Sequence, residues 1–241
     1  KMAQRIAPAL CAGLLAGMSC NVAQAQDGDW WYGGSVALTS DYVFRGVSQT
    51  DEGIALQGSL DFGHASGLYA GAWASNVDFD APDGIDIELD LYVGWTLEFA
   101  NETWLDLQLV RYLYPDANPG FGINYNEFIA AYGFRNITAT LAYTDDYINS
   151  DESALYYHLG AEFPLGATEY TLAVGAGLND ISSAAGSDYW DYQVGVSRSW
   201  DAISADLSYY DTSGFDDDVQ DFLGPEKWAD ARVVLSFSWE F

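Results

Sequence analysis

Carboxylates are the side chains of this chain that are best able to do chemistry. The sequence holds 36 Asp and Glu residues against 8 Lys and Arg residues and 2 His residues. Asp86, Glu88 and Asp90 occupy alternate positions of one stretch, so their carboxylates would line a single wall. Carboxylates along a water-filled path attract cations. Hydrolysis by a Ser–His–acid or His–metal site is disfavoured, because only His64 and His158 could serve it.

The stretch that carries these acids, Ile85–Phe99, reads as one long β-strand. Apolar residues fill its odd positions and polar residues most of its even positions, and a strand points successive side chains to opposite faces. A tilted strand needs roughly 10 residues to cross the apolar layer of an outer membrane. An apolar outer face and an acidic inner face therefore favour a transmembrane β-barrel.

Similar patterns recur along the chain and predict twelve strands. The predicted strands are 33–46, 53–63, 68–78, 85–99, 103–114, 123–134, 136–147, 153–163, 169–179, 188–199, 202–212 and 229–241. Short connections, such as 64–67 and 100–102, alternate with long ones, such as 115–122 and 213–228. Bacterial barrels combine short periplasmic turns with longer outer loops. The predicted fold is all-β: a transmembrane antiparallel up-and-down β-barrel of about 12 strands.

The start of the chain reads as a targeting segment. Residues 1–25 have a basic start, an apolar middle and an Ala-x-Ala cleavage motif that ends at Ala25, which predicts a signal peptide. Both cysteines, Cys11 and Cys20, lie within it, and the residues before Cys20 make a poor lipoprotein signal. Residues 26–241 would then form one barrel domain without cysteine, so no disulfide or thiol chemistry is expected.

Charge and composition exclude several classes of protein. The formal net charge of −28 argues against binding to nucleic acid or to anionic headgroups. A disordered acidic chain is excluded by 49% apolar and 16% aromatic residues. After the leader no run of 18 apolar residues occurs, so a helical membrane span is absent and only a barrel could cross a bilayer.

Strand parity places fourteen ionisable side chains inside the barrel, most of them acidic. They are Asp41, Arg45, Asp61, Asp86, Glu88, Asp90, Asp106, Glu127, His158, Glu162, Asp191, Asp206, Asp230 and Arg232. Two interpretations stay open: the acids set a cation preference in a pore, or they pair with Arg45 and Arg232 in a plugged interior. In both cases the acids outnumber the bases and the interior stays negative.

Arg45 and the loop acids have alternative roles as well. Arg45 precedes Gly46 beside a long loop, so it is either a gating or ligand-anchoring base, or a strut that closes the barrel mouth. The loop acids lack the spacing of a calcium loop and are better explained as a solvated rim. They are Asp216, Asp217, Asp218 and Asp221, with Asp78, Asp80 and Asp83. No metal site and no cofactor are predicted.

Aromatic residues gather near both ends of the predicted strands, as in the interfacial girdles of membrane barrels. Near the long loops lie Phe44, Tyr112, Tyr114, Tyr125, Tyr143, Tyr147, Tyr189 and Trp190, and near the short turns lie Trp95, Phe99, Trp104, Phe134, Phe163, Tyr170, Trp200, Trp239 and Phe241. The facing of strand 68–78 stays open, because small Ala70 and Ala72 alternate with large Tyr69 and Trp73.

Several segments resemble one known family. The segment Ser40–Phe79, which contains the words DYVFRG, SQT and SNVDF, is similar to the opening of the TorF-type porins of proteobacteria, long catalogued as conserved hypothetical proteins. ELDLYVGW, YTDDY, YYDTS and the closing ADARVVLSFSWEF match as well, so the resemblance spans nearly all of the mature chain. Ile54 departs from the proline expected there. The resemblance implies an outer-membrane barrel with a pore, no catalytic residues and no established substrate.

These observations predict a narrow, cation-preferring diffusion channel for small solutes in the bacterial outer membrane, and no enzyme. The alternative is a closed structural or adhesive barrel that acts through its acidic outer loops, and a hydrolase at the barrel rim is a remote third. Expected partners are outer-membrane lipid, permeating cations or other small solutes, and the assembly machinery. That machinery would read the alternating C-terminal residues Leu235, Phe237, Trp239 and Phe241.

Overall fold

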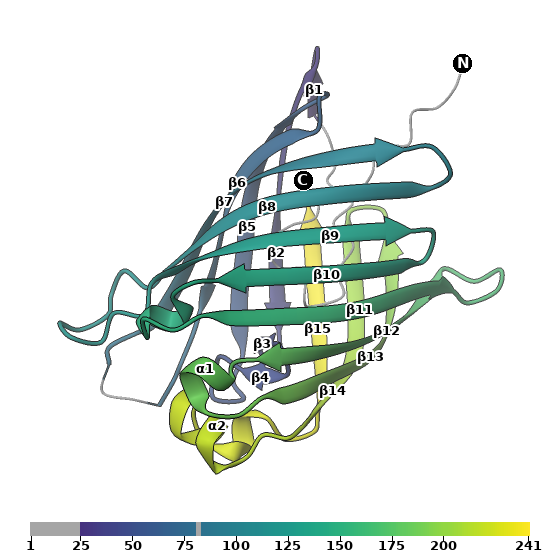
Figure 1. Ribbon diagram of the computed structural model, residues 1–241. Coiled ribbons are helices and arrows are strands. Elements are labelled where there is room, and N and C mark those ends of the chain that lie inside the picture. Colours follow the sequence, from purple (N-terminus) through teal and green to yellow (C-terminus); the bar gives the residue numbers. More distant parts are fainter. Residues whose placement is uncertain (1–24, 81–82) are drawn as a thin grey trace.

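The computed structural model describes residues 25–80 and 83–241, and twelve long strands among them form a closed antiparallel β-barrel (Figure 1). The all-β barrel predicted from the alternating pattern is confirmed. The predicted signal peptide, residues 1–25, lies outside the described residues apart from Ala25.

The first long strand closes the ring. Strand β2 (Trp30–Thr39) pairs with β5 (Ala55–His64) on one side and with β15 (Arg232–Glu240) on the other. The pairing of β15 with β2 continues at Phe241, which exchanges backbone hydrogen bonds of 2.9 and 3.0 Å with Gly34. A short strand, β1 (Ala25–Asp27), pairs antiparallel with the first three residues of β2, Trp30–Tyr32.

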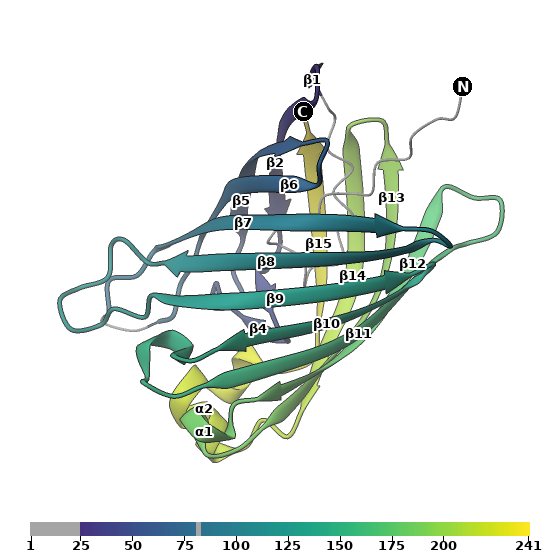
Figure 2. The same cartoon turned by 45° about the horizontal axis from the view of Figure 1, so that its top comes forward.

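The other long strands follow one another around the barrel in chain order. They are β6 (Leu68–Asn76), β7 (Ile87–Phe99), β8 (Thr103–Leu113), β9 (Tyr125–Phe134), β10 (Ile137–Thr144), β11 (Ala154–Pro164), β12 (Tyr170–Asp180), β13 (Tyr189–Trp200) and β14 (Ile203–Ser213). All predicted strands except the first agree with these bounds to within three residues. The neighbouring strands β7 to β11 lie side by side across the front of the molecule in Figure 2.

Short and long connections lie at opposite ends of the barrel, as predicted. The C-terminus lies at the short-turn end, and α1 (Ser182–Ala185) and α2 (Asp217–Leu223) lie at the other end (Figure 1). The long loops also contain two 3-10 turns, η1 (Tyr147–Asn149) and η2 (Glu226–Trp228). The long-loop end is therefore the structured mouth of the barrel.

Alternate residues of each strand face outside and inside, and β7 shows the contrast. Leu91 and Val93 are 46% and 52% exposed, whereas Asp90 and Tyr92 between them are 2% and 4% exposed. Soluble monomers rarely expose so wide an apolar belt. An apolar outside and a polar inside is the arrangement of a transmembrane barrel. Among the described residues no helix is both long and apolar enough to span a bilayer, a finding that does not bear on strands.

The structure determines the facing of β6 that the sequence left open. Tyr69 and Trp73 are buried inside the barrel, while Leu68 and Ala70 are exposed. The Tyr69 ring lies over Gly94 on the paired strand, where an added Cβ would stand 2.3 Å from the ring. Because such a ring lies along the wall, it takes less of the lumen than a side chain that projects toward the axis.

Trp104 and Gly133 form a second pair of this kind, between β8 and β9. A Cβ at Gly133 would lie 2.0 Å from the indole of Trp104, which therefore covers the glycine from the inside. The prediction that Trp104 belongs to the outer aromatic girdle is therefore wrong. Trp95 and Trp239 do face outward, with 43% and 51% of their surface exposed.

The first predicted strand, 33–46, extends too far. Strand β2 ends at Thr39, and the chain then turns into the barrel as a small hairpin of β3 (Val43–Phe44) and β4 (Val47–Ser48). The hairpin turns at Arg45 and Gly46, which have φ angles of +49° and +81°. The left-handed region is costly for a residue other than glycine, so contacts inside the barrel must hold Arg45 there.

Candidate functional site

The hairpin of residues 42–49, here called the inner hairpin, is fixed at its base by Asp41. The Asp41 carboxylate accepts hydrogen bonds from Ser48 Oγ at 2.7 Å, from Thr50 Oγ1 at 3.0 Å and from Arg232 Nη1 at 2.7 Å. Asp41 is buried, and the Arg232 side chain is 10% exposed. This ion pair joins the hairpin to the start of β15 on the neighbouring wall.

The tip of the inner hairpin crosses the lumen to the far wall. Arg45 Nη2 donates to both carboxylate oxygens of Glu127 on β9, at 2.8 and 2.7 Å. Strand β9 is five strands round the barrel from β2, where the hairpin begins. The Tyr189 hydroxyl donates to the Arg45 carbonyl at 3.1 Å. A Cβ on Gly46 would lie 2.8 Å from Asp191 Cβ, so the tip meets β13 closely enough to require glycine.

Aromatic rings enclose the Arg45 guanidinium. Its central carbon lies 4.7 Å from the Phe44 ring centre and 4.4 Å from the Tyr156 ring centre, both distances typical of cation–π contact. The Arg45 and Glu127 side chains are 3% and 1% exposed. Breaking so deeply buried an ion pair would leave a charge without a partner. The prediction that Arg45 is a strut agrees with this geometry.

Strand β7 presents two buried carboxylates to the space beside the hairpin. Glu88 and Asp90 are each 2% exposed. The Tyr42 hydroxyl donates to Glu88 Oε1 at 3.3 Å. Asp90 Oδ1 is buried and has no hydrogen-bond partner within the described residues. A buried carboxylate oxygen without a partner is unusual in a folded protein, because buried polar groups are nearly always hydrogen-bonded.

Three further acids line the barrel interior, and hydroxyl groups solvate them. Asp61 accepts from Tyr92 at 2.5 Å, Asp106 from Tyr69 at 2.8 Å, and Asp206 from Ser208 at 2.7 Å. These donors carry no charge, so they stabilise the carboxylates without neutralising them. The interior keeps a negative charge away from the inner hairpin as well as beside it.

The predicted interior residues fall into three groups. Asp41, Arg45, Asp61, Glu88, Asp90, Asp106, Glu127, Asp191 and Asp206 are buried; His158 and Arg232 are partly exposed; and Asp86, Glu162 and Asp230 are exposed. His158 stacks on the inward Tyr156 ring at 6.0 Å.

The parity prediction is wrong at the start of β7. Ile85 was expected outside and is 3% exposed, whereas Asp86 is exposed and its backbone N–H donates to Asp116. The regular strand begins only at Ile87, so the alternation does not extend to these two residues. Asp230 is also exposed, because it lies before the first residue of β15. Glu162 is exposed at the short-turn end of β11.

The sequence interpretation missed a cluster of tyrosines inside the mouth. Tyr112, Tyr125 and Tyr189 were assigned to the outer girdle, but they are 2% to 3% exposed. The Tyr112 hydroxyl donates to Glu127 at 3.1 Å. Parity could have found them, because Tyr112 shares its face with Asp106, Tyr125 with Glu127, and Tyr189 with Asp191. The girdle prediction holds for Tyr143 and Trp190, which are 45% and 46% exposed.

The chain matches the model of one protein family over residues 23–241. That model is described as a bacterial protein of unknown function, Gcw_chp. The chain belongs to the Gcw_chp family. No curated protein sequence matches the chain.

Solved structures give a second comparison. The Gcw_chp chain is similar to the KdgM porin with a TM-score of 0.54 and 9% identity, over 87% of this chain and 99% of that one. At this identity the likeness shows the fold alone. The COG4313 outer-membrane channel from Pseudomonas putida F1 gives a TM-score of 0.49 and 14% identity, over 90% of this chain and 96% of that one. The outer-membrane protein OprD from Pseudomonas aeruginosa gives 0.42 and 11%, over 90% and 66%.

Proposed function

We propose that this Gcw_chp protein is a narrow diffusion channel of the bacterial outer membrane that passes small solutes and prefers cations. The observation that carries the proposal is Asp90 Oδ1, a buried carboxylate oxygen without a hydrogen-bond partner in the described part of the chain. Arg45 and Arg232 are already paired with Glu127 and Asp41, so they do not neutralise it. A carboxylate with spare acceptor capacity beside the inner hairpin suits a passing cation.

The expected size of the effect supports selectivity. A unit charge about 4 Å from a carboxylate interacts by about 4 kcal/mol at an effective dielectric near 20. Each 1.4 kcal/mol corresponds to about a tenfold change in occupancy. Glu88 and Asp90 lie two residues apart on one face of β7, so their fields add at one wall. Salt should weaken the preference, because mobile ions screen the carboxylates in the wet part of the lumen.

An outer-membrane location agrees with the outward face of the barrel. Leu235, Phe237 and Trp239 of β15 are 43%, 49% and 51% exposed, on the side that lipid would cover. Together with Phe241 they form a segment in which apolar and polar residues alternate. We propose the outer-membrane assembly machinery, which would read this segment, as a partner. The resemblance to the TorF-type porins agrees with the proposal, although the Gcw_chp family model carries no function.

A closed barrel is the second candidate, and the filled mouth favours it. The inner hairpin and α2 contribute Val47 and Val219, 4% and 0% exposed, to one apolar cluster. If this cluster blocks the lumen, the acidic outer loops become the working surface. We propose no catalytic role, because His64 is hydrogen-bonded to a turn serine, Ser66, and lies against the Trp30 ring, while His158 stacks on a ring inside the barrel.

Planar-bilayer recording separates the two candidates. Protein refolded in detergent should show closed-barrel mobility on an unheated denaturing gel and should add stepwise current to a bilayer. Protein that folds and inserts by these criteria but passes no current would overturn the channel proposal and leave the closed barrel.

A further inference from the structure

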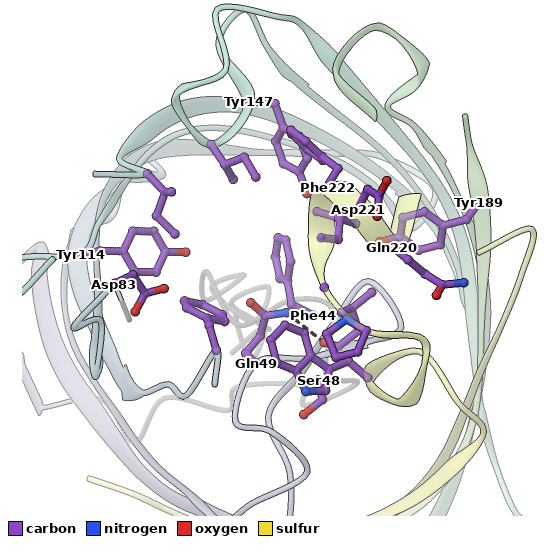
Figure 3. Close-up of a pocket in the computed structure, with 18 of the residues that line it drawn as sticks. Phe44, Ser48, Gln49, Asp83, Tyr114, Tyr147, Tyr189, Gln220, Asp221 and Phe222 are labelled. Atoms are coloured by element: carbon purple, nitrogen blue, oxygen red, sulfur yellow. Dashed lines mark hydrogen bonds between the residues drawn. The ribbon is translucent and has the colours of Figure 1, made fainter. Parts of the chain in front are cut away.

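A cavity of about 350 Å³ lies at the long-loop mouth of the barrel (Figure 3). The inner hairpin contributes Phe44 and Gln49 to its wall, and α2 contributes Asp221 and Phe222. The volume falls within the range of about 300–1,000 Å³ that is typical of small-molecule sites. The cavity therefore has room for a small organic solute beside the inner hairpin.

The lining of this cavity is aromatic and acidic. Eight of its nineteen lining residues are Phe, Tyr or Trp, and two, Asp83 and Asp221, are acids. Among the described residues the lining includes no Lys, Arg or His. Figure 3 shows Asp83 and Asp221 on opposite sides of the cavity, with Tyr114 and Tyr147 between them along the wall.

The same part of the barrel already holds an organic cation by these means. The Arg45 guanidinium stands against the rings of Phe44 and Tyr156 at 4.7 and 4.4 Å. Phe44 belongs to the cavity wall as well as to this contact. Aromatic faces attract cations through their quadrupole, and quaternary ammonium groups, which are weakly hydrated, are often recognised in this way.

We propose that this cavity, here called the mouth cavity, is a binding site for small organic cations of the quaternary-ammonium class. This proposal names a class of solute for the proposed channel. The role of the cavity in permeation rests on the proposed function. The rings would contact the alkyl groups around the nitrogen, and Asp83 and Asp221 would supply the long-range field. An anion would meet two carboxylates and no base, which disfavours it.

Choline and 3,3-dimethyl-1-butanol form a matched pair of probes, because the second replaces the ammonium nitrogen by carbon at nearly the same shape. Binding of each is measured by calorimetry on refolded protein in a non-ionic, sugar-headed detergent, which offers no competing choline headgroup. Choline should bind roughly tenfold or more tightly than the neutral probe. Equal binding of the two would reduce the site to a simple apolar pocket and overturn the proposal.

Two substitutions on α2 test the ring and the charge separately. Phe222→Leu keeps an apolar side chain but removes a ring, and Asp221→Asn keeps the size but removes a charge. Each should weaken choline binding, by roughly fivefold for the ring and less for the exposed charge. Asp217→Asn is the control, because Asp217 is an exposed acid on the same helix that does not line the cavity. Unchanged choline affinity in both cavity variants would contradict the site.

Current is not needed for this measurement, so failure of the two proposals can be told apart. A barrel that binds choline at the mouth cavity but conducts nothing keeps the site and removes the channel. A barrel that conducts but binds choline no better than the neutral probe keeps the channel and removes the site.

Discussion

At the scale of single residues, Arg45 decides whether the inner hairpin stays inside the barrel. Its ion pair with Glu127 is buried on both sides, and it is enclosed by Phe44 and Tyr156. The left-handed backbone of Arg45 is the local cost of this arrangement. The guanidinium suits the position because Nη2 donates to both Glu127 oxygens while the delocalised cation lies against the Phe44 and Tyr156 rings. Lysine would not reproduce this combination.

A double-mutant cycle tests this pair. Arg45→Met or Glu127→Gln alone should cost about 3–5 kcal/mol of unfolding free energy, because each leaves a buried charge without its partner. The double variant should recover much of that loss. Urea unfolding in detergent, followed by tryptophan fluorescence, measures the four proteins. Glu102→Gln is the control, because the Arg135–Glu102 pair is 65% and 74% exposed and should be worth about 0–1 kcal/mol. Additive single effects would show that the two residues do not act as a pair.

Asp51 in the outer loop gives a prediction that depends on pH. Lys227 and the Trp228 indole donate to its carboxylate, and these bonds lower the pKa of Asp51 below its ordinary 3.8. A lowered folded pKa stabilises the contact above pH 3.8, and that stabilisation is lost as the pH falls through the folded value. The same contact raises the pKa of Lys227 above 10.5. The stabilisation that comes from the charged lysine is therefore lost as the pH rises through the folded pKa of Lys227.

The indole N–H signal of Trp228, assigned through a Trp228→Phe variant, should report the Asp51 titration. Its midpoint should lie below pH 3.8 in the parent and should move upward in Lys227→Gln. Because both side chains are partly exposed, solvent screening will limit the effect on stability. A midpoint that does not move on loss of Lys227 would show that this lysine is not the cause.

At the scale of elements, the inner hairpin is the part that distinguishes this barrel from an empty tube. The sequence did not predict it, because the stretch 40–46 keeps a strand-like alternation of residues. Its inward turn depends on contacts that are remote in sequence, such as that between Arg45 and Glu127, 82 positions apart. No local pattern encodes a contact at that distance, whereas the strands themselves follow from nearest-neighbour alternation.

Removing the hairpin should open the lumen. The backbone N–H of Gln49 donates to the Tyr42 carbonyl at 2.7 Å, so two glycines can replace Val43–Ser48 without strain on the flanking chain. Single-channel conductance should rise in this variant, and Glu127 would then face water instead of Arg45. Gel mobility before and after heating checks that the barrel still closes. A folded variant with the parent's conductance would show that the hairpin is not the constriction.

At the scale of the whole molecule, the alternating pattern was sufficient to predict the closed barrel and the ends at which turns and loops lie. The same pattern placed buried acids such as Asp90 and Asp106 correctly. It failed where the backbone leaves regular strand geometry, as at Asp86, and where aromatic residues could face either lipid or lumen, as at Tyr125. Parity alone does not tell an interfacial tyrosine from one that packs inside the mouth.

We propose that buried carboxylates of the barrel wall make the barrel a cation-preferring channel. The reversal potential in a planar bilayer under a salt gradient tests it most directly. The parent should show the sign of cation preference, and Glu88→Gln with Asp90→Asn should move the potential toward zero. Asp217→Asn with Asp218→Asn removes the same charge from the exposed start of α2 and should leave the potential nearly unchanged. A parent potential of zero, or of the sign that marks anion preference, would contradict the account.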